Sequence, residues 1–165
     1  MFRGSIFICL IAIVFISSCG FQEKHDTLEF NTRVTTINDS LANMVTQWHD
    51  SLDHALLKQS YIELQNVRIG LGEFIAGSRL YVANTPPTKS NEKLKNLEDS
   101  LLVTQSAKVA DIYPLFEQFS ALTPKETMDK TKALLFDDLE SIQAQMAAIR
   151  KEQAVIAGKN PKKKK

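Results

Sequence analysis

The feature that most constrains the fold is a series of apolar residues separated by alternating steps of three and four. These residues are Phe30, Val34, Ile37, Leu41, Met44, Trp48, Leu52 and Ala55. Their spacing puts an apolar side chain on the same face at every helical turn, which predicts a long amphipathic helix over 28–57. A helix of about thirty residues is about 45 Å long at 1.5 Å per residue, so we expect a rod-shaped domain.

Three further segments have the same helical period, over 60–84, 90–119 and 124–158. Ser60 and Glu63 have the spacing of a capping box at the start of the second helix. Pro114 predicts a kink or a short break at Tyr113, because proline removes a backbone hydrogen bond. Thr123 is the expected cap of a fourth helix that begins at Pro124 and continues without interruption.

Four periodic segments with short connections and no strand-like alternation predict an all-α fold, an elongated up-down-up-down four-helix bundle over 27–158. Gly70 and Gly77 are one heptad apart, which indicates that a neighbouring helix approaches closely there. The predicted core includes Leu41, Trp48, Leu64, Leu139 and Ile142.

The first eighteen residues have the layout of a cleaved signal peptide, with a positive charge at Arg3 and an apolar run over 6–16. The run is shorter than the roughly 20 residues that a transmembrane helix needs. Ile16-Ser17-Ser18-Cys19 resembles the lipobox of bacterial lipoproteins, whose cysteine is acylated and becomes the first residue of the mature chain. The resemblance implies that Cys19 is the lipidation site and that 19–26 is a lipidated tether. The alternative is an ordinary secretory signal with an incidental cysteine.

Cysteine and charge limit the functions of the mature chain. The only other cysteine is Cys9, within the signal peptide, which excludes a disulfide and thiol catalysis. Residues 19–158 carry fourteen Lys and Arg against nineteen Asp and Glu, a net charge of −5, and five lysines follow in the tail 159–165. We expect this tail to be disordered, either solubilising the protein or attracting anionic surfaces. Nucleic acid is not expected as a partner.

The most metal-like cluster consists of His49, Asp50, Asp53 and His54, which form two pairs four residues apart on the first helix. No third ligand is evident for either pair, so we expect no bound metal. Neither the Glu-x-x-His motif of di-iron bundles nor the Cys-x-x-Cys-His motif of covalent haem is present, and no cofactor is expected.

Two adjacent acid pairs, Glu98 with Asp99 and Asp137 with Asp138, were the remaining candidates for acid–base chemistry. Adjacent helical residues point about 100° apart, so we interpret both pairs as solvent-facing. No nucleophile, base and orienting group occur at a suggestive spacing, and the chain is not expected to be an enzyme.

Four Asp-Ser/Thr-Leu triplets contain Thr27, Ser40, Ser51 and Ser100. They resemble the triplet that receives O-glycans on exported proteins of Bacteroidota, which makes these four residues candidate glycosylation sites. We expect Thr27, in the tether, and Ser51, near the end of the first helix, to be the most accessible. The alternative is that aspartate and serine commonly flank the apolar stripe of a helix.

The whole pattern resembles a group of small surface lipoproteins of unknown function from spirochaetes and Bacteroidota. The resemblance rests on Cys19, the Glu29-Phe30-Asn31 entry to the first helix, Leu52-Asp53, Tyr113 and the long last helix. It implies a lipid-anchored protein of the bacterial cell envelope, at the outer membrane on its periplasmic or surface face. Such a protein presents its bundle to an unknown envelope protein or has a structural role. The alternative is a periplasmic ligand sensor or carrier with a pocket inside the bundle.

Overall fold

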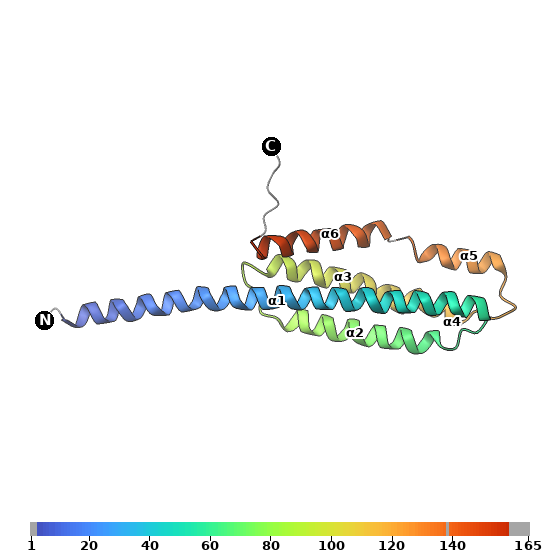
Figure 1. The fold of residues 1–165 in the computed structure, drawn as a ribbon, viewed down its shortest axis with the longest axis horizontal. Coiled ribbons are helices and arrows are strands. Elements are labelled where there is room, and N and C mark those ends of the chain that lie inside the picture. The colour runs from blue at the N-terminus through green and yellow to red at the C-terminus, as the bar shows by residue number, and fades with distance from the viewer. Residues whose placement is uncertain (1–2, 138, 159–165) are drawn as a thin grey trace, which may run out of the picture.

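The computed structural model of the chain describes residues 3–137 and 139–158, with side chains from residue 22 onward. All regular structure within these ranges is helical (Figure 1). The helices are α1 (Arg3–Lys58), α2 (Leu64–Asn84), α3 (Glu92–Asp111), α4 (Tyr113–Glu117), α5 (Lys125–Leu134) and α6 (Leu139–Ile156). The predicted all-α class is confirmed.

Helices α1, α2, α3 and α6 form an elongated four-helix bundle (Figure 1). Helix α1 packs against α2 and α6, and α3 packs against the same two helices from the opposite corner. The predicted up-down-up-down arrangement is confirmed. Helix α6 packs mainly on α3, and its packing against α1 is sparser. The bundle therefore has one loosely packed seam, between α1 and α6.

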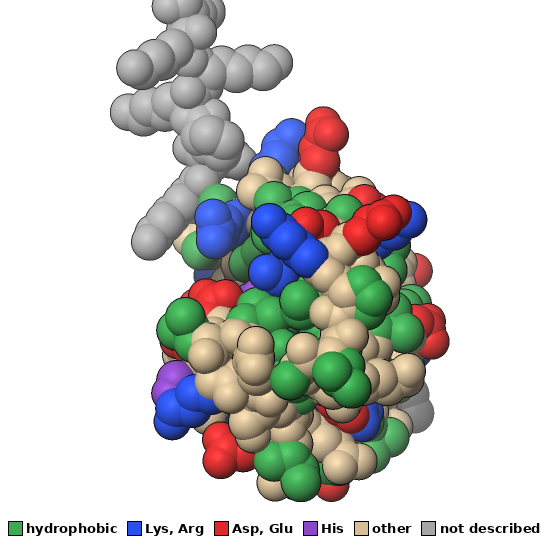
Figure 2. Space-filling model, turned by 90° about the vertical axis from the view of Figure 1, so that its right-hand side faces the viewer, with side chains coloured by type: hydrophobic (Ala, Val, Ile, Leu, Met, Phe, Trp, Pro, Cys, Tyr) green, Lys and Arg blue, Asp and Glu red, His purple; other side chains and the backbone are tan. Residues whose placement is uncertain are grey.

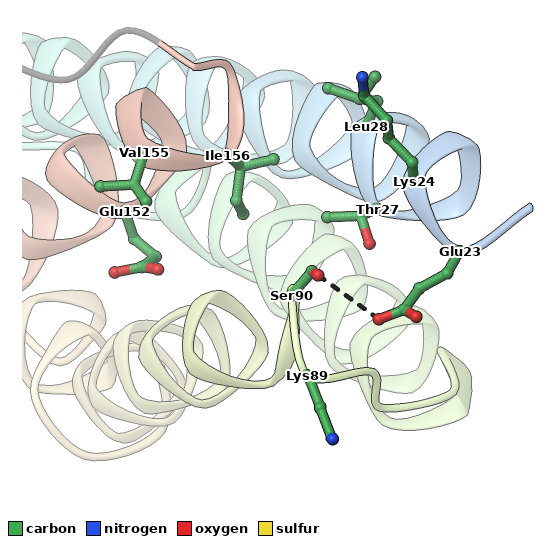
Figure 3. Close-up of a pocket in the computed structure, with 9 residues that line it drawn as sticks. All are labelled: Glu23, Lys24, Thr27, Leu28, Lys89, Ser90, Glu152, Val155 and Ile156. Atoms are coloured by element: carbon green, nitrogen blue, oxygen red, sulfur yellow. Dashed lines mark hydrogen bonds between the residues drawn. The ribbon is translucent and has the colours of Figure 1, made fainter. Parts of the chain in front are cut away.

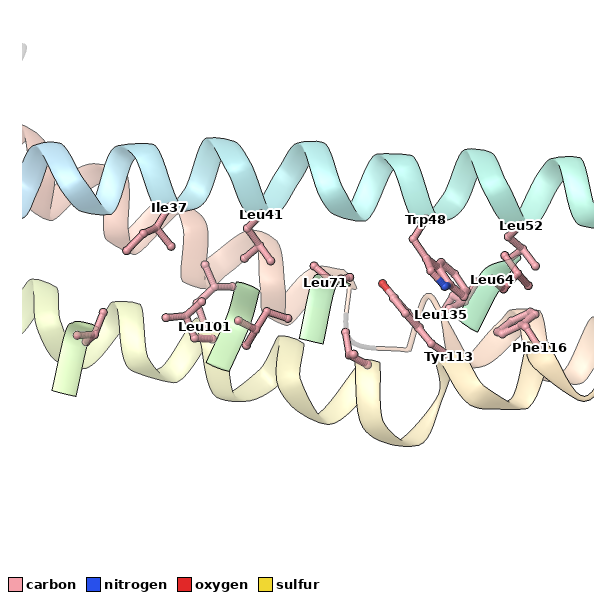
Figure 4. Packing of buried hydrophobic residues seen from close by; sticks show 14 of the residues in the cluster. Ile37, Leu41, Trp48, Leu52, Leu64, Leu71, Leu101, Tyr113, Phe116 and Leu135 are labelled. Atoms are coloured by element: carbon pink, nitrogen blue, oxygen red, sulfur yellow. The ribbon is translucent and has the colours of Figure 1, made fainter. Parts of the chain in front are cut away.

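The core is built on the apolar stripe of α1, as predicted (Figure 4). Trp48 is fully buried, and its ring stacks on Tyr113 with 3.7 Å between ring centroids. Leu41 and Leu64 are also buried, and Ile142 is half-buried against the cluster, so these core predictions are confirmed. Burial of large aromatic and aliphatic side chains supplies most of the favourable free energy of folding.

Helix α1 begins much earlier than the predicted 28–57 helix and passes through residues 19–26. The segment expected to be a tether is therefore helical. It contains no proline and only one glycine, Gly20, and its other residues include the good helix formers Gln22, Glu23 and Lys24. Beyond the bundle, α1 continues as a single projecting helix (Figure 1).

The break expected at Pro114 is present. Helix α3 ends at Asp111 and α4 begins at Tyr113, so the interruption falls at Ile112, one residue before the expected position. Pro114 lies in the first turn of α4, where a missing N–H leaves no helical hydrogen bond unmade. The break turns Tyr113 and Phe116 into the core, where both are buried.

The predicted capping box at Ser60 and Glu63 is wrong. Helix α2 begins at Leu64, and Glu63 makes no side-chain capping hydrogen bond. Instead, Gln59 adopts a positive φ of 54°, and the Ser60 N–H donates to the Ala55 carbonyl at 3.2 Å. Helix α1 therefore ends in a Schellman motif. The Ser60 N–H is bonded within this motif, so it is not available to the Glu63 side chain for a capping box.

The single fourth helix predicted over 124–158 is also wrong, because α5 and α6 are separate. At their junction the Leu135 N–H donates to the Lys132 carbonyl, three residues back, at 3.0 Å. The Leu135 carbonyl accepts a hydrogen bond from Nζ of the buried Lys108 at 3.0 Å. The break changes the helical register, so Leu135 is buried whereas Leu139, predicted as core, is 45% exposed.

Two smaller expectations fail for similar local reasons. Helix α5 begins at Lys125 after Pro124, with no side-chain cap, because the Thr123 hydroxyl accepts from the Ser120 N–H at 2.8 Å instead. No helix approaches Gly70 or Gly77, since a Cβ added at either would meet nothing within 4 Å. Neither glycine is therefore required by packing.

Candidate functional site

Cys19, the predicted lipidation site, lies in the N-terminal part of α1, and its side chain is outside the described residues. The described helices include none that is both long enough and apolar enough to span a membrane. The lysines of 159–165 also lie outside the described residues.

The four candidate glycosylation residues all lie within helices, and their accessibility differs from the expected order. Thr27 is buried, with its hydroxyl 3.5 Å from that of Thr88, because α1 continues through the expected tether. Ser51 is half-buried and donates to the Gln47 carbonyl at 2.8 Å. Ser40 is also half-buried, whereas Ser100 on α3 is exposed. The expectation that Thr27 and Ser51 are more accessible than Ser40 and Ser100 is therefore wrong.

The weak metal candidates do not form a common site. His49 is half-buried and meets Trp48 edge-on at 5.3 Å between ring centroids, whereas Asp50, Asp53 and His54 are exposed. Burial lowers the pKa of His49, with Asp53 opposing that effect and Lys108 adding to it. Among the described residues, no three His, Cys, Asp or Glu side chains are placed to hold a metal ion.

Glu98 was predicted to face solvent, and this prediction is wrong. It is fully buried in α3, where its Oε2 accepts a hydrogen bond from Nδ2 of Asn38 on α1 at 2.9 Å. Burial raises the pKa of Glu98 to about 7, although the bond from Asn38 opposes the rise. Its neighbour Asp99 points outward to Arg79, at 3.5 Å. The interpretation of both acids as solvent-facing therefore holds for Asp99 and fails for Glu98.

The Asn38–Glu98 pair has one buried oxygen on each side chain without a hydrogen-bond partner among the described residues, Oδ1 and Oε1 respectively. A proton on Glu98 Oε1 turns it into a donor, and Asn38 Oδ1 is an acceptor on the residue to which Glu98 is already bonded. Protonation therefore removes a buried charge from the core. The pair favours the neutral carboxyl group.

Asn38 also lines a cleft of about 250 Å³ along the sparsely packed seam between α1 and α6. Polar contacts cross this seam, since Gln153 Nε2 donates to the Thr35 hydroxyl at 2.9 Å. Ile149 is the only residue of α6 that is buried. Helix α6 is therefore held partly by exposed polar contacts, which contribute less than apolar burial.

A second cavity, which we call the proximal pocket, lies at the end of the bundle where α1 projects (Figure 3). Its volume is about 510 Å³. It is bounded by α1, by the connection between α2 and α3, and by the last turn of α6. The lining residues are Glu23, Lys24, Thr27, Leu28, Lys89, Ser90, Glu152, Val155 and Ile156. The pocket thus combines charged and apolar side chains.

The opposite end of the bundle carries exposed apolar residues, seen end-on in Figure 2. Leu57, Ile62 and Leu122 are 84%, 81% and 91% exposed. Leu57 lies in the last turn of α1, and Ile62 and Leu122 lie in the α1–α2 and α4–α5 connections, which are both at this end (Figure 1). We call these three residues the distal apolar end. They lie in the last turn of α1 and in two connections, and not on the core stripe.

The support beneath the distal apolar end is well packed. Tyr61 and Phe119 are buried and meet edge-on, with 5.7 Å between ring centroids. A half-buried ion pair between Arg68 and Glu117 joins α2 to α4, and the hydrogen bond that Arg68 donates to Glu117 raises the pKa of Arg68. The backbone that carries the exposed leucine and isoleucine side chains is therefore held in place by packed residues beneath it.

Sequence reasoning missed Glu98 although a signal for it was present. Leu94, Glu98 and Leu101 are spaced by four and then three residues, so the glutamate occupies a core position of the stripe. The error arose because Glu98 was interpreted together with its neighbour Asp99 and not with the apolar stripe.

No family model, curated protein sequence or solved structure matches this chain.

Proposed function

We propose that this chain is a non-catalytic, lipid-anchored protein of the bacterial cell envelope that presents the distal apolar end to a protein partner. Acyl chains on Cys19 hold it in the outer membrane, since several chains anchor a protein far more stably than one. The lipobox-like Ile16-Ser17-Ser18-Cys19 supports the anchor. The rod then separates the membrane from the partner by the length of the bundle.

The observation that carries the proposal is the placement of Leu57, Ile62 and Leu122 at the end of the bundle farthest from Cys19. Single exposed apolar side chains are common, but three at one end of the bundle form an apolar surface whose exposure to water is unfavourable. Protein interfaces have apolar centres of this kind. Because the residues beneath this surface are already packed, little backbone has to be ordered when a partner binds, which lowers the entropy cost of binding.

Site-specific photo-crosslinking in the native envelope tests this surface. Ile62 and Leu122 are replaced, one at a time, by a photoreactive phenylalanine analogue, and Leu80 serves as the matched control. Leu80 is 63% exposed but lies within α2, away from both distal connections. We expect the same adduct mass from Ile62 and Leu122 and no such adduct from Leu80. An adduct of equal yield at all three positions, or at none, contradicts the proposal.

A further inference from the structure

A groove on the side of the bundle, between α1 and α2, has a volume of about 360 Å³. We call it the α1–α2 groove. The lining residues that bear on its chemistry are Arg33 and Ile37 of α1 and Glu73, Phe74, Gly77 and Tyr81 of α2. At 1.5 Å per residue, Ile37 lies about 30 Å from the end of α1 at Lys58. The groove is therefore separate from the distal apolar end.

Gly77 leaves space in the α1–α2 groove. A Cβ added at Gly77 would meet nothing within 4 Å, so no neighbouring side chain requires a glycine at this position. Glycine also lowers the stability of a helix relative to alanine. Phe74 and Tyr81 lie one turn before and one turn after Gly77 on the same face of α2, and both are half-buried against the core. The missing side chain thus keeps the groove open between two aromatic residues.

Arg33 is the cation at one end of the groove. Its guanidinium carbon lies over the Tyr81 ring, 5.5 Å from the ring centroid, and Tyr81 is itself stacked on Phe30. Arg33 has no ion-pair partner among the described residues. Stacking engages the face of a guanidinium group and leaves the N–H groups at its edge, which can donate two hydrogen bonds to one carboxylate. Arg33 is therefore suited to bind a carboxylate group.

Glu73 is the anion at the other end of the groove. It precedes Tyr81 by eight residues, which is a separation of about 12 Å along α2. Glu73 is exposed and has no ion-pair partner in the part of the chain that the structure describes. A ligand whose carboxylate lies at the Arg33 end can therefore place an ammonium group at the Glu73 end.

A short peptide has this distribution of charges. An extended chain advances about 3.3–3.6 Å per residue, so the termini of three residues are about 10–11 Å apart. In a single amino acid the ammonium and carboxylate groups are attached to one carbon, and a fatty acid has no ammonium group. An apolar side chain on the middle residue is then placed at Gly77, beside Phe74 and the buried Ile37. A tripeptide thus matches both the charged and the apolar parts of the groove.

We propose that the α1–α2 groove binds free peptides of about three residues with an apolar middle side chain. Arg33 binds the C-terminal carboxylate, Glu73 binds the N-terminal ammonium group, and the space at Gly77 accepts the side chain. An internal segment of a longer chain has neither terminal charge, so the groove selects free peptides. The protein then has a small-ligand site on the side of the bundle in addition to the distal apolar end.

The test uses the chain 19–165 with Cys19→Ser, which lacks the apolar signal segment. All described buried residues lie at or after Thr27, so this chain keeps the described core. The isotope-labelled protein is titrated with alanyl-phenylalanyl-alanine at low salt, and amide shifts are followed by NMR. We expect saturable shifts centred on Gly77 and Ile37. N-acetylation or C-terminal amidation of the peptide removes one exposed ion pair and should weaken binding about fivefold.

Matched variants assign the contacts, with circular dichroism confirming that the helices persist. Gly77→Leu fills the open part of the groove and is expected to abolish binding. Gly70→Leu, at the other unpacked glycine of α2, is expected to leave the affinity unchanged. Arg33→Gln should weaken binding of the free peptide about fivefold and remove the difference between the acid and its amide. Glu73→Gln should likewise remove the difference between the free and the N-acetylated peptide.

Three results overturn the proposal. They are the absence of saturable shifts at millimolar peptide, equal affinity for the free, N-acetylated and amidated peptides, and equal affinity of folded Gly77→Leu and wild type. The three peptide forms are compared on the unchanged groove, so they test the proposal even where a variant fails to fold. No variant alters the distal apolar end or the lipidation site, so the result is independent of the proposed function.

Discussion

Replacement of Glu98 by glutamine removes the one carboxyl group that the described core buries completely, and the structure sets the size of the effect. The pKa of Glu98 rises from 4.5 to about 7 on burial. A shift of one unit corresponds to about 1.4 kcal/mol, so ionisation of Glu98 costs the folded state about 3 kcal/mol. Glutamine keeps an acceptor for Asn38 Nδ2 and carries no charge at any pH.

The sign of the pH dependence follows from the direction of the shift. Below pH 4.5 Glu98 is protonated in both the folded and unfolded states, and the full stability is present. Between pH 4.5 and about 7 the unfolded state releases the proton first, so the free energy of unfolding falls. Above about 7 the loss is complete. Glu98→Gln is therefore expected to resemble the wild type at pH 4 and to exceed it by about 3 kcal/mol at pH 8.

Urea unfolding followed by circular dichroism from pH 4 to pH 8 measures this difference directly. Subtracting the free energy of unfolding of the wild type from that of Glu98→Gln at each pH cancels the contributions of the other titrating groups. The control is Asp99→Asn, since Asp99 is adjacent, 49% exposed and paired with Arg79. An exposed pair contributes at most about 1 kcal/mol, so this variant should follow the wild-type curve. Parallel curves for wild type and Glu98→Gln would refute the buried, protonated carboxyl group.

Two further predictions concern packing. Leu135→Ala should cost about 2–5 kcal/mol in the free energy of unfolding, as for a buried leucine, whereas Leu139→Ala should cost under about 1 kcal/mol because its side chain is 45% exposed. Reversed costs would mean that α5 and α6 form one continuous helix. Gly70→Ala and Gly77→Ala should each raise the free energy of unfolding by up to about 1 kcal/mol, because both positions have room for a Cβ. A loss of stability would show a close contact there.

Local patterns in the sequence predicted the helices well where one face repeats without interruption. The stripe from Phe30 to Leu52 is buried in the structure apart from the half-buried Met44, and Pro114 interrupts the third segment as expected. Both signals are local, because periodicity and a missing N–H act within a few turns of the chain.

The errors arise where a distant residue decides a local conformation. The Leu135 carbonyl is satisfied by Lys108, which is 27 residues away, and the last helix divides at that point. The stripe predicts a core position at Glu98, but the donor that its buried carboxyl group receives comes from Asn38, 60 residues away. Thr27 is buried against Thr88 from the α2–α3 connection. None of these partners can be identified from a window of ten or fifteen residues.

Acylation of Cys19 is the central claim of this account, because the placement of both ends of the rod depends on it. The most direct measurement is incorporation of labelled palmitate into the full chain in a bacterial host, with fractionation of membranes from soluble protein. We predict that the wild type carries the label and pellets with the membranes. Cys19→Ser should lose the label and move to the soluble fraction. Unlabelled wild type, or a Cys19→Ser protein that keeps both the label and the pelleting, would contradict the account.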